Sequence, residues 1–336
     1  MVNNFFIFFI IFSFAIIFFC RKYNVLLDQK IEKHKKYSAR SRSFLIGGIL
    51  IISFLNYYYL SIKQDPALCF FINLAFLIGL MSDLKKINSV SLRFLLQCTL
   101  VLLFVNLLNI KIDYIRIEFF DQWLTLPLIS IFFASFCLLV LLNGSNFIDG
   151  INGLTIGYYS IIFLTIFVNL NYLEYDKVLL NNLIVILFIV LLLNLYGILY
   201  LGDSGSYTLG LFTGIFLIDF AHNNNSISPY FIIILVWYPC FELLFSMIRR
   251  FLKKIKTYEP DTTHLHHLVY SKIKTYFKIK NNNISHLLTN IVINFYNLFC
   301  FFISIKYIYS SKILVTIFFI NIIVYVSSYN YLKKKI

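Results

Sequence analysis

Eleven apolar runs follow one another along this chain, and each is roughly long enough to cross a lipid bilayer. A transmembrane helix needs about 20 predominantly apolar residues, and only helices and closed barrels satisfy every backbone polar group in lipid. The sequence therefore predicts an all-α, polytopic transmembrane helix bundle of about 11 spans. These lie near residues 4–20, 44–62, 67–82, 91–108, 126–142, 153–171, 178–196, 206–220, 229–248, 285–305 and 312–331.

The composition agrees with this architecture and excludes a soluble domain of the same size. The 336 residues are 60% hydrophobic and only 13% charged, and their mean hydropathy is +0.81. The six cysteines are scattered singly through apolar runs, which is typical of small buried hydrophobic side chains rather than of metal ligands.

The net charge of +14 carries information about topology. Most Lys and Arg residues fall in four segments, 21–43, 83–93, 249–283 and 333–335, which eleven spans place on one side of the membrane. Because basic loops stay in the cytoplasm, we predict an external N-terminus and a cytoplasmic C-terminus. Charge confined to loops in this way predicts no binding of nucleic acid. The mixed segment 109–125 predicts a short extracytoplasmic hairpin or an interfacial element.

The stretch from Asn143 to Leu154 places three Asn, one Asp and three Gly between two apolar runs. It is unfavourable for a membrane span and predicts irregular backbone, which is tolerated near lipid where protein or a watery cavity surrounds it. A simple turn between two spans is the alternative. Three further polar clusters, at 79–93, 200–206 and 249–267, fall on the same predicted side. Acidic residues that recur at one membrane boundary favour a shared site.

These clusters suit phosphoryl transfer. Asp and Asn supply hard oxygen ligands for Mg²⁺, which binds proteins through one or two carboxylates together with substrate phosphates. Arg and His side chains neutralise phosphates, and glycine-rich loops present backbone N–H groups. The three histidines of 264–267 also permit a zinc site. No cysteine or second histidine group accompanies them, and the neighbouring Arg249, Arg250 and Lys253 would repel a cation, so anion binding is favoured.

Three motifs together carry a family resemblance. They are Asn-x-x-Asn-x-x-Asp-Gly-x-x-Gly-Leu at 143–154, Gly-Asp-Ser-Gly-Ser at 202–206 and Pro-Asp-x-x-His-Leu-His-His at 260–267. In combination and order they resemble the polyprenyl-phosphate N-acetylhexosamine-1-phosphate transferases, the glycosyltransferase 4 family. The His-Leu-His-His pattern is more similar to the antigen-initiating branch than to the peptidoglycan branch, in which the corresponding histidines are consecutive.

The resemblance implies an activity. The expected reaction transfers N-acetylhexosamine-1-phosphate from a UDP-sugar, first of all UDP-N-acetylglucosamine, to undecaprenyl phosphate and releases UMP. It would be the first membrane step of a cell-surface polysaccharide such as lipopolysaccharide O-antigen. The implied cofactor is Mg²⁺, with Mn²⁺ as a substitute, and the implied location is the bacterial cytoplasmic (inner) membrane. We expect one integral membrane domain, 1–336, with membrane lipid around it and a homodimer as an option. Its active site would be built from cytoplasmic loops 21–43, 83–90, 143–152, 197–205 and 249–283.

The resemblance also assigns roles to individual residues, each at the position that matches the family pattern. The implied metal ligands are Asp203 and the assisting Asn146. Tyr200 matches an aromatic residue that stacks on uracil. The implied catalytic and phosphate-contacting residues are Asp83, Arg93, Asp149, His264, His266 and His267. The implied nucleotide- or substrate-binding residues are Asn143, Asn152, Gly153, Tyr200 and Arg249.

Three positions depart from the family pattern. Ser82 and Asn152 stand where many members have Asp, and Glu242 stands where Asp is common. A serine cannot act as a carboxylate base, so the sequence favours direct attack by a lipid phosphate that is already ionised. Two other hypotheses stay open: a transporter or flippase for an anionic glycolipid, and a catalytically inactive relative that acts as a scaffold.

Overall fold

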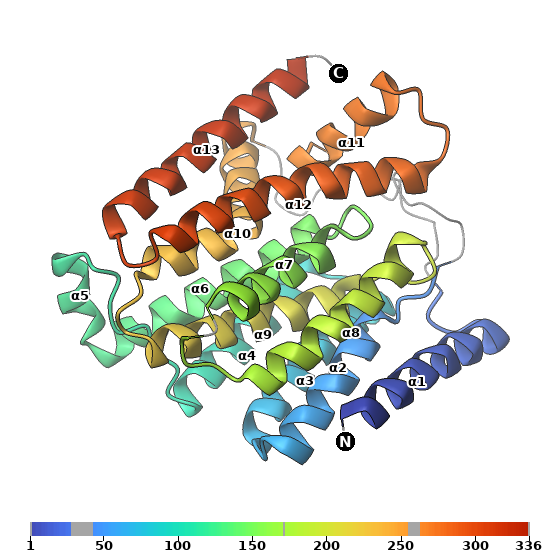
Figure 1. The fold of residues 1–336 in the computed structure, drawn as a ribbon, viewed down its shortest axis with the longest axis horizontal. Helices are drawn as coiled ribbons and strands as arrows, with labels where there is room; N and C mark the ends of the chain where they lie inside the picture. Colours follow the sequence, from blue (N-terminus) through green and yellow to red (C-terminus); the bar gives the residue numbers. More distant parts are fainter. Residues whose placement is uncertain (1, 28–42, 171, 255–262, 335–336) are drawn as a thin grey trace.

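The computed structural model describes residues 2–27, 43–170, 172–254 and 263–334, and these residues are almost entirely helical (Figure 1). Within those ranges, β-structure is limited to isolated bridges that join Leu27 to Phe44 and Phe44 to Leu199. The helices are α1 (Val2–Tyr23), α2 (Gly47–Tyr57) with a π-helical turn at Tyr58–Ile62, α3 (Pro66–Asp83), α4 (Val90–Leu107), α5 (Glu118–Leu124), α6 (Pro127–Ile148), α7 (Leu154–Asn169), α8 (Lys177–Leu195), α9 (Gly202–Asn223), α10 (Pro229–Leu252), α11 (Leu265–Tyr276), α12 (Asn282–Lys306) and α13 (Ser311–Lys334).

A helix covers each of the apolar runs predicted from the sequence. Among the described residues, eight helices are long and apolar enough to cross a membrane: α3, α4, α6, α8, α9, α10, α12 and α13. Two shorter apolar helices, Gly47–Ile62 and Leu154–Asn169, cover two further runs, and α1 covers the first. The all-helical, multi-pass architecture is thereby confirmed, whereas the count of about 11 spans and the orientation of the termini stay predictions.

Helix α9 lies at the centre of the bundle, where it packs against α2, α3 and α6. Of the eight long apolar helices it is the least apolar and the most buried. Its small residues, among them Gly205, Ser206, Gly210 and Gly214, let neighbouring backbones approach closely. A helix surrounded by protein does not need a lipophilic surface, and this explains why a weakly hydrophobic segment occupies the core.

Helix α10 contains Pro239 in its interior and bends near its middle (Figure 1). Proline lacks the N–H that would bond the carbonyl four residues earlier, so the Leu235 carbonyl loses its helical partner. The hydroxyl group of Tyr158, on α7, donates to that carbonyl at 2.8 Å. The break in α10 is therefore tolerated, because the carbonyl that it leaves free is hydrogen-bonded. The half of the helix that follows the break carries the polar residues Glu242, Arg249 and Arg250.

Two expectations about the polar stretches were wrong in their local structure. Residues 143–148, predicted as loop, continue α6, and Gly202 to Gly205, predicted mostly as loop, form the first turn of α9. In α6 the Asn143 side-chain amide donates to the Leu139 carbonyl at 3.0 Å, and the Ser145 hydroxyl donates to the Leu141 carbonyl at 2.6 Å. These polar side chains bond to their own helix and so remain compatible with it. The span predicted at 206–220 is consequently a full-length helix.

The segment 109–125 contains irregular backbone followed by the short helix α5, so the predicted hairpin is wrong and the interfacial alternative stays open. Arg116 of this segment donates to the carbonyls of Ser226 and Ile227 at 2.9 Å each. It thereby ties the segment to the turn between α9 and α10.

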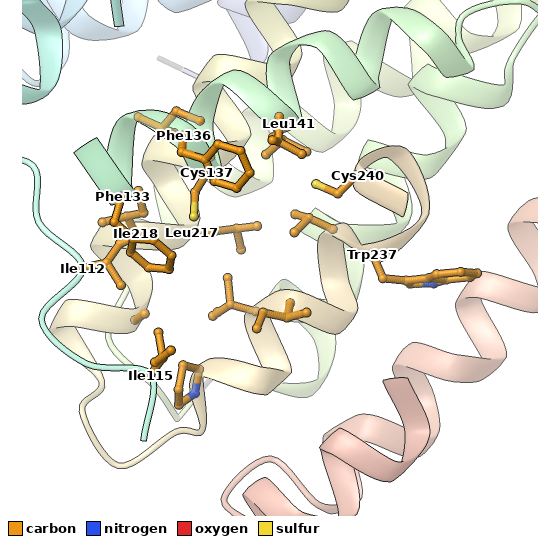
Figure 2. Close-up of a pocket in the computed structure, with 18 of the residues that line it drawn as sticks. Ile112, Ile115, Phe133, Phe136, Cys137, Leu141, Leu217, Ile218, Trp237 and Cys240 are labelled. Carbon is orange, nitrogen blue, oxygen red and sulfur yellow. The ribbon is translucent and has the colours of Figure 1, made fainter. Parts of the chain in front are cut away.

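An apolar cavity of about 390 Å³ lies between α6, α9 and α10 (Figure 2). In that view Ile112 and Ile115 lie at one end, and Leu141 and Cys240 lie toward the other. Lys111, Asp113 and His222 also line the cavity, at the end of α9 that is remote from Asp203. The cavity therefore extends along the helices from the far end of the bundle toward the polar motifs.

The contact between α3 and α9 gives a first prediction. A Cβ atom on Gly79 would lie 2.4 Å from the Ser204 Cα, a backbone atom that cannot move aside without shifting α9. We expect Gly79→Ala to destabilise the folded protein by about 1–3 kcal/mol, the usual cost of overpacking. Thermal unfolding of detergent-solubilised protein should show a lower Tm. The exposed Leu77→Ala, on the same helix, is the control. An equal Tm for both variants would contradict the close packing.

Candidate active site

The carboxylate of Asp203, in the first turn of α9, lies at the centre of the predicted site. Its Oδ1 accepts from the Asn146 side-chain amide at 2.7 Å, which connects it to the last turn of α6. Its Oδ2 accepts from the Ser82 hydroxyl at 2.5 Å and from the Arg93 guanidinium at 2.9 Å. Arg93 also donates to the Ser82 hydroxyl oxygen at 2.5 Å. The ends of α3, α4, α6 and α9 thus meet at one carboxylate, as the sequence predicts.

Asp83 holds the start of α9 in place. Its two carboxylate oxygens accept from the backbone N–H groups of Asp203 and Ser204, at 2.9 and 3.0 Å. These are among the N–H groups that a helix start leaves without an internal partner, and a negative charge there also favours the helix dipole. Gly202 has a φ of +73°, and a Cβ on it would lie 2.7 Å from Asp83 Oδ2. Glycine at 202 therefore permits both the turn and the approach of the carboxylate.

Asp149 caps the end of α6 and belongs to the same cluster. Burial raises the pKa of its carboxyl group well above the ordinary value, and the nearby charges of Asp203 and Asp83 raise that pKa further. The next residue, Gly150, touches the histidine cluster, since a Cβ on it would lie 2.5 Å from His267 Nε2 and 3.0 Å from His266 Nε2. The turn at 149–150 therefore connects the carboxylate cluster with the histidines.

The three predicted histidines lie together at the start of α11. The ring centroids of His266 and His267 are 4.3 Å apart, and those of His264 and His266 are 5.4 Å apart with nearly parallel planes. Burial lowers the pKa of His266 well below its ordinary value, and the other two histidines lower it further. His266 is therefore a neutral imidazole near neutral pH, and in the described part of the chain neither of its ring nitrogens has a hydrogen-bond partner. A neutral imidazole still carries one N–H group, so this compact cluster can donate hydrogen bonds to phosphate oxygens.

Glu242 supports this cluster and was not among the predicted site residues. It is fully buried in α10, and its Oε1 lies 2.9 Å from His264 Nδ1. Its Oε2 lies 4.0 Å from His266 Nδ1. The sequence did carry a signal, because an acidic residue inside an apolar span is a functional candidate by default.

The turn at 152–154 is held by polar side chains from two other helices. The Asn152 N–H donates to His286 Nδ1 at 3.1 Å, and the Gly153 N–H donates to Asn194 Oδ1 at 2.5 Å. The side-chain amide of Asn294 donates to the Leu154 carbonyl at 3.2 Å. His286, Asn194 and Asn294 lie within runs assigned as spans, so their polarity there was the signal that identifies them.

Three other predicted residues have different surroundings. Asn143 bonds back to its own helix, as described above. The Tyr200 N–H donates to the Phe44 carbonyl, and the Tyr200 carbonyl accepts from the Gly47 N–H. Tyr200 precedes Gly202, the first residue of α9, by two residues. Arg249 donates to the Thr263 carbonyl at 2.8 Å and to the Tyr329 hydroxyl at 3.1 Å. Most of the predicted loop 21–43, and residues 255–262 of the loop 249–283, lie outside the described residues.

The oxygen atoms of this site fit a magnesium ion that is completed by a substrate. Among the side chains described, no group of three or more His, Cys, Asp or Glu residues encloses a metal by itself. Mg²⁺ does not require such a cage, because it binds through one or two carboxylates, phosphates and water. Asp203 Oδ1 and both oxygens of Asp83 each accept a single hydrogen bond, so each retains acceptor capacity. The clustered negative charges that raise the pKa of Asp149 would be relieved by a cation.

Comparison with known proteins agrees with the geometry. Residues 66–221 match the model of Glycosyl transferase family 4. Over these residues, a little under half of the chain, the protein resembles this family. The match to the glycosyl transferase family 4 model includes Asp83, Arg93, Asn146, Asp149 and Asp203, and it ends before α10 and the histidines.

Curated relatives extend the similarity. The chain is 27% identical over 258 residues to the "Probable undecaprenyl-phosphate N-acetylglucosaminyl 1-phosphate transferase" of Bacillus subtilis (strain 168), covering 74% of the chain and 66% of that relative. It is 27% identical over 239 residues to the "Undecaprenyl-phosphate alpha-N-acetylglucosaminyl 1-phosphate transferase" of Salmonella typhi, covering 67% and 64%. It is 25% identical over 279 residues to the protein of that name in Yersinia pestis, covering 78% and 75%. The chain thus spans just under two thirds of the first two relatives.

The surroundings of Asp149 give a second prediction. A raised pKa means that the charged carboxylate destabilises the folded state at high pH, and that this effect declines as the pH falls until the group is protonated in the unfolded state as well, near its ordinary pKa of 3.8. We expect Asp149→Asn to raise the Tm of the metal-free protein at pH 8 and to lose this advantage progressively as the pH falls toward about 4, near the ordinary pKa of 3.8. Thermal unfolding in the presence of a chelator measures the Tm difference at pH 8 and its change with pH. The exposed Asp113→Asn is the control and should show no such pH-dependent gain. A lower Tm for Asp149→Asn at pH 8 would contradict the buried, crowded carboxylate.

Proposed function

We propose that this protein transfers N-acetylhexosamine-1-phosphate from a UDP-sugar, UDP-N-acetylglucosamine first of all, to undecaprenyl phosphate and releases UMP. The observation that carries the proposal is the convergence of Asp83, Asp149 and Asp203 with the histidines of α11 at one end of the helix bundle. The match to the family model and the names of the relatives support the same reaction class. The proposed location is the cytoplasmic face of a bacterial inner membrane, in agreement with the basic residues near the site.

The proposed chemistry is a direct displacement at phosphorus. An oxygen of the lipid phosphate forms a bond to the phosphorus that carries the sugar. The bond from this phosphorus to the oxygen bridging it to UMP breaks, and UMP leaves with the electron pair. Arg93 and the histidines of α11 are positioned to hold phosphate oxygens, and Tyr200 is assigned to stack on uracil. Bound Mg²⁺, held by Asp203 with help from Asn146 and Asp83, supplies charge neutralisation.

A carboxylate base at position 82 is absent from this mechanism. The Ser82 hydroxyl donates its proton in a hydrogen bond to Asp203, so it does not act as a base that removes a proton from the lipid phosphate. A phosphate monoester is largely ionised near neutral pH, so its oxygen is already a nucleophile. Positioning and charge neutralisation therefore account for the proposed catalysis.

The apolar cavity supports a lipid acceptor. Its wall includes Leu141, which lies five residues before Asn146 on α6, or about 8 Å along the helix at 1.5 Å per residue. From there the cavity extends to Ile112 and His222 at the other end of the bundle (Figure 2). The cavity begins close enough to the carboxylate cluster for the phosphate of the lipid to lie at the cluster while its isoprenoid chain lies in the cavity. We propose the cavity as the place for part of that chain.

This function gives a third prediction. Membranes containing the protein should release UMP from UDP-N-acetylglucosamine only when a divalent cation, Mg²⁺ or Mn²⁺, and undecaprenyl phosphate are both present. We expect Asp203→Ala to lower this rate by at least about 100-fold, since it removes an electrostatic centre of the site. The exposed Glu174→Gln, in the segment between α7 and α8 and outside the cavity, should keep the wild-type rate.

The sugar is identified by the same assay. Membranes receive a panel of UDP-N-acetylhexosamines, and mass spectrometry identifies the lipid-linked product. Release of UMP without any lipid-linked product would contradict the proposed acceptor. If folded protein binds UDP but no donor in the panel is turned over, the proposed transferase activity is wrong.

A further inference from the structure

The contact between Arg93 and Asp203 neutralises the carboxylate that is proposed to hold the metal. The guanidinium lies 2.9 Å from Asp203 Oδ2, and the two side chains are only 24% and 26% exposed. The Ser82 hydroxyl lies between them, since it accepts from Arg93 and donates to Asp203, both at 2.5 Å. Oδ2 therefore accepts two hydrogen bonds, one from a full positive charge.

A cation approaching this site alone would meet Arg93. Positive charges so close to one another repel strongly at the effective dielectric near a protein surface. A divalent ion would therefore be repelled at Oδ1, and it would reach Oδ2 only by displacing the guanidinium, which would lose two hydrogen bonds. A bound diphosphate changes this balance, because its oxygens accept hydrogen bonds from Arg93 and also coordinate the ion.

Serine at position 82 makes this arrangement specific. A serine hydroxyl donates to Asp203, whereas a carboxylate at the same place would repel Asp203 and would accept the guanidinium in its stead. An aspartate there would consequently create two adjacent carboxylates, which attract a divalent cation without help from a substrate. The identity of residue 82 thus decides whether Asp203 is countered by Arg93 or is available to a metal.

We propose that Ser82 and Arg93 make divalent-cation binding conditional on the nucleotide diphosphate. Arg93 neutralises Asp203 in the free protein and moves to phosphate oxygens when the nucleotide binds, so that nucleotide and cation bind cooperatively. Linkage requires the coupling to be reciprocal, so the cation strengthens nucleotide binding by the same factor. This inference rests on the proposed function for the identity of the ligands, and it concerns binding rather than turnover.

The test measures Mn²⁺ binding to purified protein in detergent by electron paramagnetic resonance, without any lipid acceptor. Wild-type protein should bind Mn²⁺ at least about 5-fold more tightly with saturating UDP than without it, the lower end of typical coupling. The Mn²⁺–UDP complex measured without protein is subtracted. Ser82→Asp and Arg93→Gln should each bind Mn²⁺ at least about 5-fold more tightly than wild type in the absence of UDP, and for both variants UDP should add less than about 2-fold.

The matched control is Ser226→Asp, which adds the same charge in the exposed turn after α9, at the opposite end of that helix from Asp203. It should behave as wild type. Gel filtration and Tm establish that each variant is folded, and Arg93→Gln decides the question if Ser82→Asp does not fold. Mn²⁺ affinities of the free variants that are equal to or weaker than wild type would overturn the inference. The proposed function fails separately, through the absence of UMP release, because this titration needs no turnover.

Discussion

The hydrogen bonds from the start of α9 to the carboxylate of Asp83 are the interaction on which the rest of the site depends. They fix the end of α3 against the first turn of α9, and that turn carries Asp203. The absence of side chains on Gly79 and Gly202 allows the two helices to approach this closely. Once α9 is fixed there, Arg93 of α4 and Asn146 of α6 reach the same carboxylate. Asp83 therefore has two effects. It stabilises the start of α9, and it adds negative charge beside Asp203, where a metal is proposed to bind.

The second half of the site depends on irregular backbone that other helices satisfy. Pro239 interrupts α10, and the Tyr158 hydroxyl bonds the carbonyl that this leaves free. Beyond the break, α10 presents Glu242 to His264. The turn at 152–154 is bonded in the same manner by side chains of α8 and α12. Departures from regular helix persist inside a membrane protein when buried side chains replace the missing bonds, and both departures here lie beside the histidines or the carboxylates.

Much of this arrangement was predictable from the sequence, and the limits have physical causes. The apolar runs identified the helices because lipid imposes a minimum length, and the spacing of polar motifs identified the common end where Asp83, Asp149 and Asp203 meet. The local structure of residues 143–148 was not predictable from composition, since Asn143 and Ser145 bond to carbonyls of their own helix. Asn194 was missed, and Glu242 was noted only as a departure from the family pattern, because a single polar residue in an apolar run does not reveal its partner. The pairing of Ser82 with Arg93 depends on side-chain geometry that no spacing rule encodes.

The low hydrophobicity of α9 has a consequence for how this protein is made. The free energy of transfer into lipid is less favourable for a helix with this many Gly, Ser and Thr residues than for its neighbours. Its own hydrophobicity therefore provides only a weak driving force for membrane insertion. Its principal partners α2, α3 and α6 all precede it in the sequence, and so they are synthesised and inserted earlier. The order of the segments thus allows these three helices to be in place before the weakly apolar α9 is inserted, and the carboxylate cluster around Asp203 forms only when that helix arrives.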